Sequence, residues 1–143
     1  MYLFAQLITS FISSAAFSFI FNVPKKLLPY CGTVGMLGWG VYIVGTMLGL
    51  DTIPATLIAS FLVTIISQLF SKLFKTPIIV FSVSGIIPLV PGGIAFDAMK
   101  HVVENQYDTA VQLAVKAFMI SGAIAIGLVF SEVINQIIRR SGR

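Results

Sequence analysis

Residues 52–71 read TIPATLIASFLVTIISQLFS, a run of 20 residues without a charged side chain. Asp51 stands immediately before this run and Lys72 immediately after it. A helix needs about 20 mostly apolar residues to cross the hydrocarbon core of a bilayer. The run therefore predicts a membrane-spanning helix with a charged residue at each end.

Similar runs lie on both sides of it, and the composition of the whole chain agrees. Of 143 residues, 57% are hydrophobic and 10% are charged, with a mean hydropathy of +1.00, whereas roughly 25% of residues are charged in soluble domains. We predict an all-α integral membrane protein, with residues 1–143 forming a single transmembrane domain. About five membrane-spanning helices are expected, at approximately residues 2–22, 29–50, 52–71, 76–96 and 109–131.

The charged residues between these runs predict an orientation. Cytoplasmic loops are enriched in Lys and Arg. With five spans, seven basic residues fall on one side of the membrane: Lys25, Lys26, Lys72, Lys75, Arg139, Arg140 and Arg143. The other side holds mostly acidic residues and one basic residue: Asp51, Asp97, Glu104, Asp108 and Lys100. This asymmetry predicts an N-terminus outside and a cytoplasmic C-terminus, and the scattered charges exclude a nucleic-acid-binding face.

The fourth expected span contains residues 84–93, SGIIPLVPGG. Each proline removes a backbone donor and clashes with the preceding helical turn, and Gly92 and Gly93 permit conformations closed to other residues. We expect the helix to break near Pro88–Gly93 and a new helix to begin near Ile94. Breaks of this kind bind substrate in many transporters. A simple kink, or an exit from the membrane with Asp97 at its boundary, remains the alternative.

The expected substrate pathway consists of the break and its polar neighbours: Ser82, Ser84, Pro88, Pro91, Gly92, Gly93 and Asp97. Ser82 and Ser84 share a face if their segment is extended. In the second span, Gly38, Gly45 and Gly49 are predicted to form a helix-packing face. Two further groups are candidates for a charge or coupling role. The alternative for Lys116 is that its side chain snorkels towards the headgroups. The alternative for Glu132 is that it lies at a solvated helix end.

Catalytic chemistry finds no support in the sequence. There is no Ser/His/Asp set, no phosphate-binding loop and no Cys/His spacing typical of a metal site. A membrane-embedded enzyme usually needs clustered acids or histidines, and the five acids here are scattered. We therefore expect neither an enzyme nor a bound cofactor or metal.

Several short motifs resemble those of a known family. They are Phe21-Asn22-Val23-Pro24, the following Cys31, and Gly35-x-x-Gly38-x-Gly40. The break segment Ile86-Ile87-Pro88-x-x-Pro91-Gly92 leads into Phe96-x-Ala98-Met99. In order and spacing they resemble the small membrane subunit of the threonine/serine exporter family.

This resemblance runs from about residue 4 to residue 138. It implies a secondary exporter of small hydrophilic metabolites, threonine and serine or a dicarboxylate such as succinate, in the inner membrane of a bacterium. The resemblance covers only the C-terminal half of the single-chain exporters. It therefore implies a larger membrane subunit as partner. A homo-oligomer is the alternative, and no nucleic-acid partner is expected. A non-transporting assembly subunit remains the alternative function.

Overall fold

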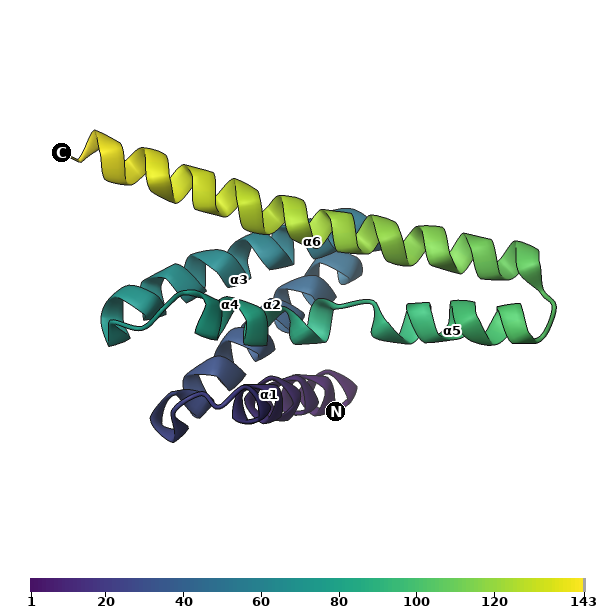
Figure 1. Ribbon diagram of the computed structural model, residues 1–143, viewed down its shortest axis with the longest axis horizontal. Coiled ribbons are helices and arrows are strands. Elements are labelled where there is room, and N and C mark those ends of the chain that lie inside the picture. Colours follow the sequence, from purple (N-terminus) through teal and green to yellow (C-terminus); the bar gives the residue numbers. More distant parts are fainter. Residues whose placement is uncertain (143) are drawn as a thin grey trace.

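The computed structural model describes residues 1–142, and Arg143 lies outside the described residues. The chain is 87% helical and shows no strand in this range. Figure 1 shows the helices in chain order: α1 Tyr2–Ile20, η1 Lys25–Leu27, α2 Leu28–Met47, α3 Thr52–Phe74, α4 Ile79–Ile86, η2 Ile87–Leu89, α5 Gly92–Val103 and α6 Tyr107–Ser141.

Four helical segments are long and apolar enough to cross a membrane, namely α1, η1 with α2, α3, and α6. The pair formed by Ile79–Leu89 and Gly92–Val103 is bent by 49° and counts as a fifth crossing if it is one broken span. The prediction of an all-α membrane protein with about five spans is therefore confirmed.

The short helix α4 lies at the centre of the bundle, where it contacts α1, α2 and α3. The long helix α6 packs against α3 with one half and against α5 with the other. In Figure 1 the α5–α6 hairpin projects to the right of the other helices. The break between η2 and α5 therefore lies where the central bundle meets the projecting hairpin.

Many helix contacts are made by small and hydroxyl-bearing residues around a few large ones such as Phe81, while most large apolar side chains face outward. The buried polar side chains of the described chain are all serines and threonines: Ser10, Ser14, Ser18, Thr56, Ser60, Thr64, Ser67, Ser84 and Ser131. Most of these hydroxyls donate to a backbone carbonyl one turn earlier in their own helix, as Ser18 does to Ser14. Lipid is as apolar as leucine, so membrane helices associate through close packing of small residues. The burial pattern is the one expected of a membrane bundle.

Glycines allow close approaches between helices, as two positions show. A methyl group at Gly38 would overlap Val63 of α3, and one at Gly127 of α6 would overlap Ser60 and lie 2.9 Å from the Leu57 carbonyl oxygen. Gly49 differs from the prediction that it packs. It follows the end of α2, has a φ of +92° and would meet nothing within 4 Å, so its role is to permit the left-handed turn into α3.

Two helices extend beyond the apolar runs that predicted them. The helix after the break begins at Gly92 instead of near Ile94, and it continues through the polar residues to Val103. The last helix covers 35 residues, Tyr107–Ser141. Hydropathy marks only the part of a helix that fits the hydrocarbon core, and a charged helix end remains helical in water. The α5–α6 hairpin therefore has a charged tip.

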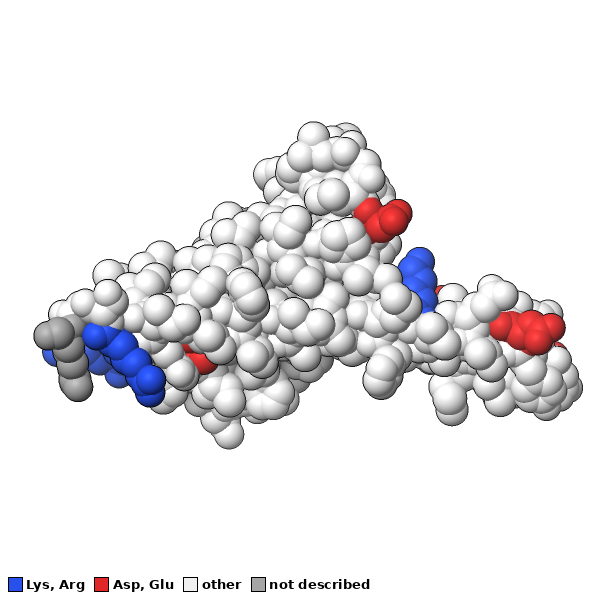
Figure 2. All heavy atoms as spheres, turned by 90° about the horizontal axis from the view of Figure 1, so that it is seen from above, with Lys and Arg blue, Asp and Glu red and all other residues white. Residues whose placement is uncertain are grey.

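Charged side chains separate along the long axis of the molecule. Lys26, Lys72 and the C-terminal end of α6 lie at the same end, and Figure 2 shows blue side chains gathered there. Most of the red surface lies towards the opposite end, where some blue is also visible, and a smaller red area lies near the basic end. The basic end suits a cytoplasmic location under the positive-inside rule, and the orientation itself stays a prediction.

The α3–α6 contact can be tested with a matched pair of glycines on one helix. We expect Gly127→Ala to lower the free energy of unfolding by about 1–3 kcal/mol, because the added methyl group meets backbone atoms of α3 that cannot move aside. Gly122→Ala meets nothing within 4 Å and is expected to be neutral or to stabilise by up to about 1 kcal/mol. Thermal unfolding in detergent compares the two variants, and equal losses would contradict the packing argument.

Candidate functional site

The helical hydrogen-bond ladder is interrupted between η2 and α5. Val90 is extended, with φ −63° and ψ 129°, and Pro91 has φ −79° and ψ 50°. The Gly92 N–H donates to the Val90 carbonyl at 2.8 Å, whereas in a continuous helix it would donate to Pro88. The carbonyl of Pro88 therefore loses its helical partner.

The first turn of α5 adds free donors on the other side of the break. The first N–H groups of any helix have no acceptor within that helix. Here the Ala95 N–H returns to the Pro91 carbonyl at 3.0 Å, while Gly93 and Ile94 have no corresponding bond to Leu89 or Val90. Backbone acceptors and donors thus lie within a few residues of one another.

A cavity of about 180 Å³ adjoins this break. Residues 88–91 form one wall, and Gly93 and Ile94 continue it into α5. The opposite walls come from three other helices and are made by Trp39, Tyr42, Thr52, Thr56 and Ile120. No charged side chain is among these lining residues, so any polar ligand here would meet hydroxyl groups, the tyrosine and the backbone.

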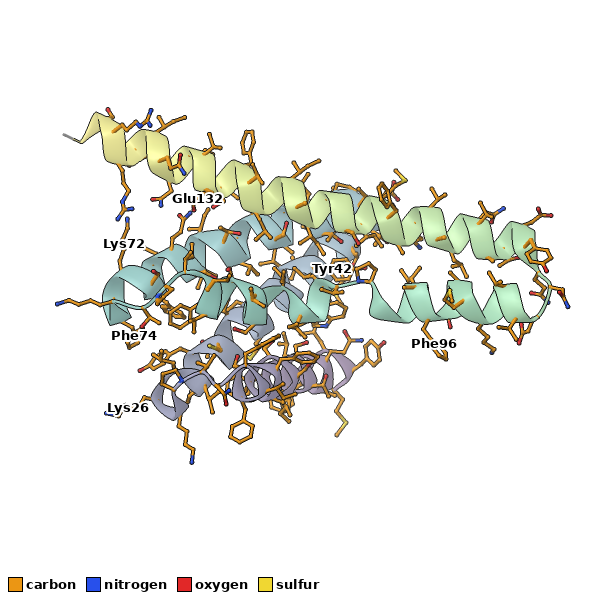
Figure 3. The ribbon with its side chains drawn as sticks, in the orientation of Figure 1. Lys26, Tyr42, Lys72, Phe74, Phe96 and Glu132 are labelled. Atoms are coloured by element: carbon orange, nitrogen blue, oxygen red, sulfur yellow. The ribbon has the colours of Figure 1, made fainter. Side chains whose placement is uncertain are left out.

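Two aromatic residues of α2 form a fixed side of the cavity. The rings of Trp39 and Tyr42 stack with their centroids 4.9 Å apart and their planes at 25°. The Trp39 Nε1–H donates to Gln6 Oε1 of α1 at 3.0 Å, which fixes the orientation of the indole. Tyr42 lies beside the gap between η2 and α5 in Figure 3.

The predicted pathway residues are only partly brought together. Pro88, Pro91 and Gly93 line the break cavity, whereas Gly92 faces a broader apolar hollow between α5 and α6. Asp97 is exposed on α5 and lines neither space, and its backbone carbonyl contacts His101 Nδ1 at 3.0 Å.

The two serines of the fourth span correct an expectation. They lie in helix α4, so consecutive residues turn by about 100° and residues two apart do not share a face. Ser84 is buried and donates its hydroxyl to the Val80 carbonyl. It lines a separate apolar cavity of about 280 Å³ beside Ser18, and Ser82 lines neither this cavity nor the break cavity.

The candidate charged residues lie well apart. Lys116 is exposed on α6, and within residues 1–142 it has no carboxylate within 4.0 Å. This placement suits the snorkelling alternative. Glu132 is half-buried and lines a polar cavity near the basic end, distant from the break along α6.

Comparison with known proteins gives the chain a family. The family model described as "Threonine/Serine exporter, ThrE" matches residues 6–134. The chain belongs to the threonine/serine exporter family. Its members are membrane transporters, so an exporter-type transport role follows for this chain. No solved structure matches it.

The matched range of this exporter-family chain includes cavity residues that the sequence analysis missed. Tyr42, Thr52 and Thr56 belong to α2 and α3, and each is an ordinary residue in its own helix. The Thr56 hydroxyl donates to the Thr52 carbonyl at 2.7 Å, which leaves its oxygen able to accept. Only the packing of α2 and α3 around the break reveals these residues. Trp39 alone has an unusual local sequence, because Gly38 and Gly40 flank it.

Thiol labelling tests whether water enters the break cavity. We expect a cysteine at position 93, made by Gly93→Cys, to react with a membrane-impermeant methanethiosulfonate. It should react at least about tenfold faster than one made by Ala125→Cys on the exposed face of α6, because only a hydrated thiol ionises to the reactive thiolate. The native Cys31 is fully buried and supplies the unreactive baseline. Equal rates at positions 93 and 125 would show that the cavity is not water-accessible.

Proposed function

We propose that this chain is the small subunit of a two-component exporter of small hydrophilic metabolites, and that substrate passes the break cavity. Threonine and serine are the leading substrates, with a dicarboxylate such as succinate as the alternative. Family membership supports the transport role. The observation that carries the pathway is the cavity at the broken span, which joins free backbone groups to side chains from three other helices.

The chemistry of the cavity suits a small polar molecule. Backbone that is not helical at membrane depth must be buried in protein or line a wet space, because lipid cannot satisfy its N–H and C=O groups. The N–H groups of Gly93 and Ile94 are placed to donate to a carboxylate at a helix N-terminus. The hydroxyls of Tyr42 and Thr56 are placed to contact a polar side chain.

A larger partner subunit is proposed because this chain leaves the break partly uncovered. Val90 is 49% exposed at the break, and α5 packs mainly on α6. Both helices of the α5–α6 hairpin carry exposed large apolar residues, including Phe96 of α5 and Phe118 of α6. A second membrane domain packed against the α5–α6 hairpin and the uncovered side of the break would complete the walls of a pathway. A second copy of this chain is the alternative occupant.

Efflux from cells that lack native exporters tests the proposal. Cells are loaded with threonine from a peptide, or with succinate, and express this chain, the candidate larger subunit, or both. We expect efflux only with both subunits. We also expect Thr56→Val and Pro91→Ala to assemble normally and reduce efflux several-fold, since the first removes a cavity hydroxyl and the second restores a backbone donor. Gly122→Ala is the matched control.

The outcomes separate the candidate functions. Normal efflux from correctly assembled Thr56→Val and Pro91→Ala would favour the assembly subunit, in which the partner carries the whole pathway. Efflux from this chain alone would contradict the two-component proposal and favour a homo-oligomer. Asp97→Asn is expected to retain efflux, because Asp97 lies outside the break cavity.

A further inference from the structure

Another cavity, of about 140 Å³, lies between α3 and α6 near the basic end of the molecule. Its lining is mostly polar and includes Gln68 and Lys72 of α3 together with Glu132, Asn135 and Arg139 of α6. A single water needs about 10–15 Å³, so the cavity has room for more than one water. It differs from the break cavity in having charged side chains of both signs.

The spacing of these residues gives each helix a polar stripe. Gln68 and Lys72 are four residues apart on α3, and Glu132, Asn135 and Arg139 are three and four residues apart on α6. Residues at these intervals share one helix face. Because α3 and α6 pack against each other, the two stripes face one another at the cavity.

Glu132 is held in place from both sides without a basic partner. Gln68 Nε2 donates to Glu132 Oε2 at 3.3 Å and also to the Ser131 carbonyl at 3.5 Å. Gln136 Nε2 donates to Glu132 Oε1 at 3.4 Å. Two neutral amides orient this half-buried carboxylate, and within the described part of the chain no Lys or Arg nitrogen lies within 4.0 Å of it.

The cations of the cavity are also without acidic partners. Within residues 1–142, neither Lys72 nor Arg139 has a carboxylate within 4.0 Å, since the one ion pair there joins Lys100 and Glu104. Lys72 and Glu132 are labelled at the same end of the α3–α6 contact in Figure 3. Lys72 lies one helical turn beyond Gln68, the residue bonded to Glu132, or about 6 Å along the axis. An anionic group and a cationic group therefore line one space without neutralising each other.

We propose that this cavity binds a zwitterion that carries an ammonium group and an oxyanion a few atoms apart. Glu132 accepts the ammonium group, and Lys72 and Arg139 hold the oxyanion. Within the proposed export function, on which this choice of source rests, the ligand is a free α-amino acid. A phosphatidylethanolamine headgroup has the same chemistry and is the competing source.

The same arrangement selects against a dicarboxylate. A ligand with a second carboxylate in place of the ammonium group would place that charge against Glu132, and like charges at close range repel. The cavity thus favours threonine or serine over succinate, a choice that the uncharged lining of the break cavity does not make. The role of Glu132 is discrimination between these ligands.

Equilibrium binding of radiolabelled L-threonine to the full chain in phosphatidylcholine nanodiscs tests the site. Competitors are threonine methyl ester, which lacks the carboxylate, 3-hydroxybutyrate, which lacks the ammonium group, and succinate. We expect Lys72→Gln and Arg139→Gln each to weaken threonine binding about tenfold, in line with the loss of a charged hydrogen bond, and to leave binding of the methyl ester nearly unchanged. Glu132→Gln is expected to abolish the preference for threonine over 3-hydroxybutyrate and succinate.

Lys75→Gln and Arg140→Gln are the matched controls, because each removes a neighbouring charge that does not line the cavity. If these controls weakened threonine binding as much as Lys72→Gln and Arg139→Gln, the effect would be due to net charge and the proposal would be overturned. So would a Glu132→Gln variant with unchanged selectivity, or a folded wild-type chain that binds no threonine. Loss of threonine binding when phosphatidylethanolamine is added to the nanodiscs would assign the cavity to lipid and overturn the amino-acid ligand.

Binding and efflux fail independently. Selective binding without efflux in any subunit combination would contradict the export function and leave the site intact. Efflux that persists with unchanged selectivity in Glu132→Gln would contradict the site and leave the export function intact.

Discussion

The backbone of a membrane protein must find its hydrogen-bond partners within the protein, because hydrocarbon offers none. Apart from the turns that connect successive helices, the described chain satisfies that requirement with helices except at residues 90–91, where Pro91 supplies no N–H and the ladder stops. One side of the interruption lies against α2, α3 and α6. The arrangement of the other helices around α4 and η2 is what makes the break tolerable.

Close packing of small residues brings those helices near enough to surround the break. Gly85 of α4 illustrates the constraint, since a methyl group there would lie 2.5 Å from Val34 of α2 and 2.7 Å from Val63 of α3. These contacts hold α4 tightly against α2 and α3. The residues after η2 therefore cannot move in to fill the space beside the break. The 49° bend carries α5 away onto α6, and the volume left beside Trp39 and Tyr42 becomes the cavity.

The sequence predicts features that depend on local chemistry and misses those that depend on tertiary packing. Charge spacing predicts the helices, and two prolines followed by two glycines predict the break. The orientation of Ser82 and Ser84 depends on whether the chain before Pro88 is helical or extended. The β-branched and apolar residues of that segment are compatible with both conformations, so they do not predict which one forms. Tyr42 and Thr56 reach the cavity only through the packing of three helices. Gly49 has the four-residue spacing from Gly45 that predicts a packing face, but α2 ends before it.

The two cavities divide the chemistry that transport of a zwitterion requires. A charged site binds selectively only where water still reaches it, because burying an unpaired charge is costly, and the Lys72–Glu132–Arg139 cavity lies at a helix end where the cations stay exposed. The break cavity lies towards the other end of α3, beside Thr52 and Thr56, and offers only hydroxyls and backbone dipoles. Such groups bind a polar molecule weakly enough to release it. Under the orientation expected from the basic end, a cytoplasmic substrate meets selection first and the broken helix second, the order that an exporter needs.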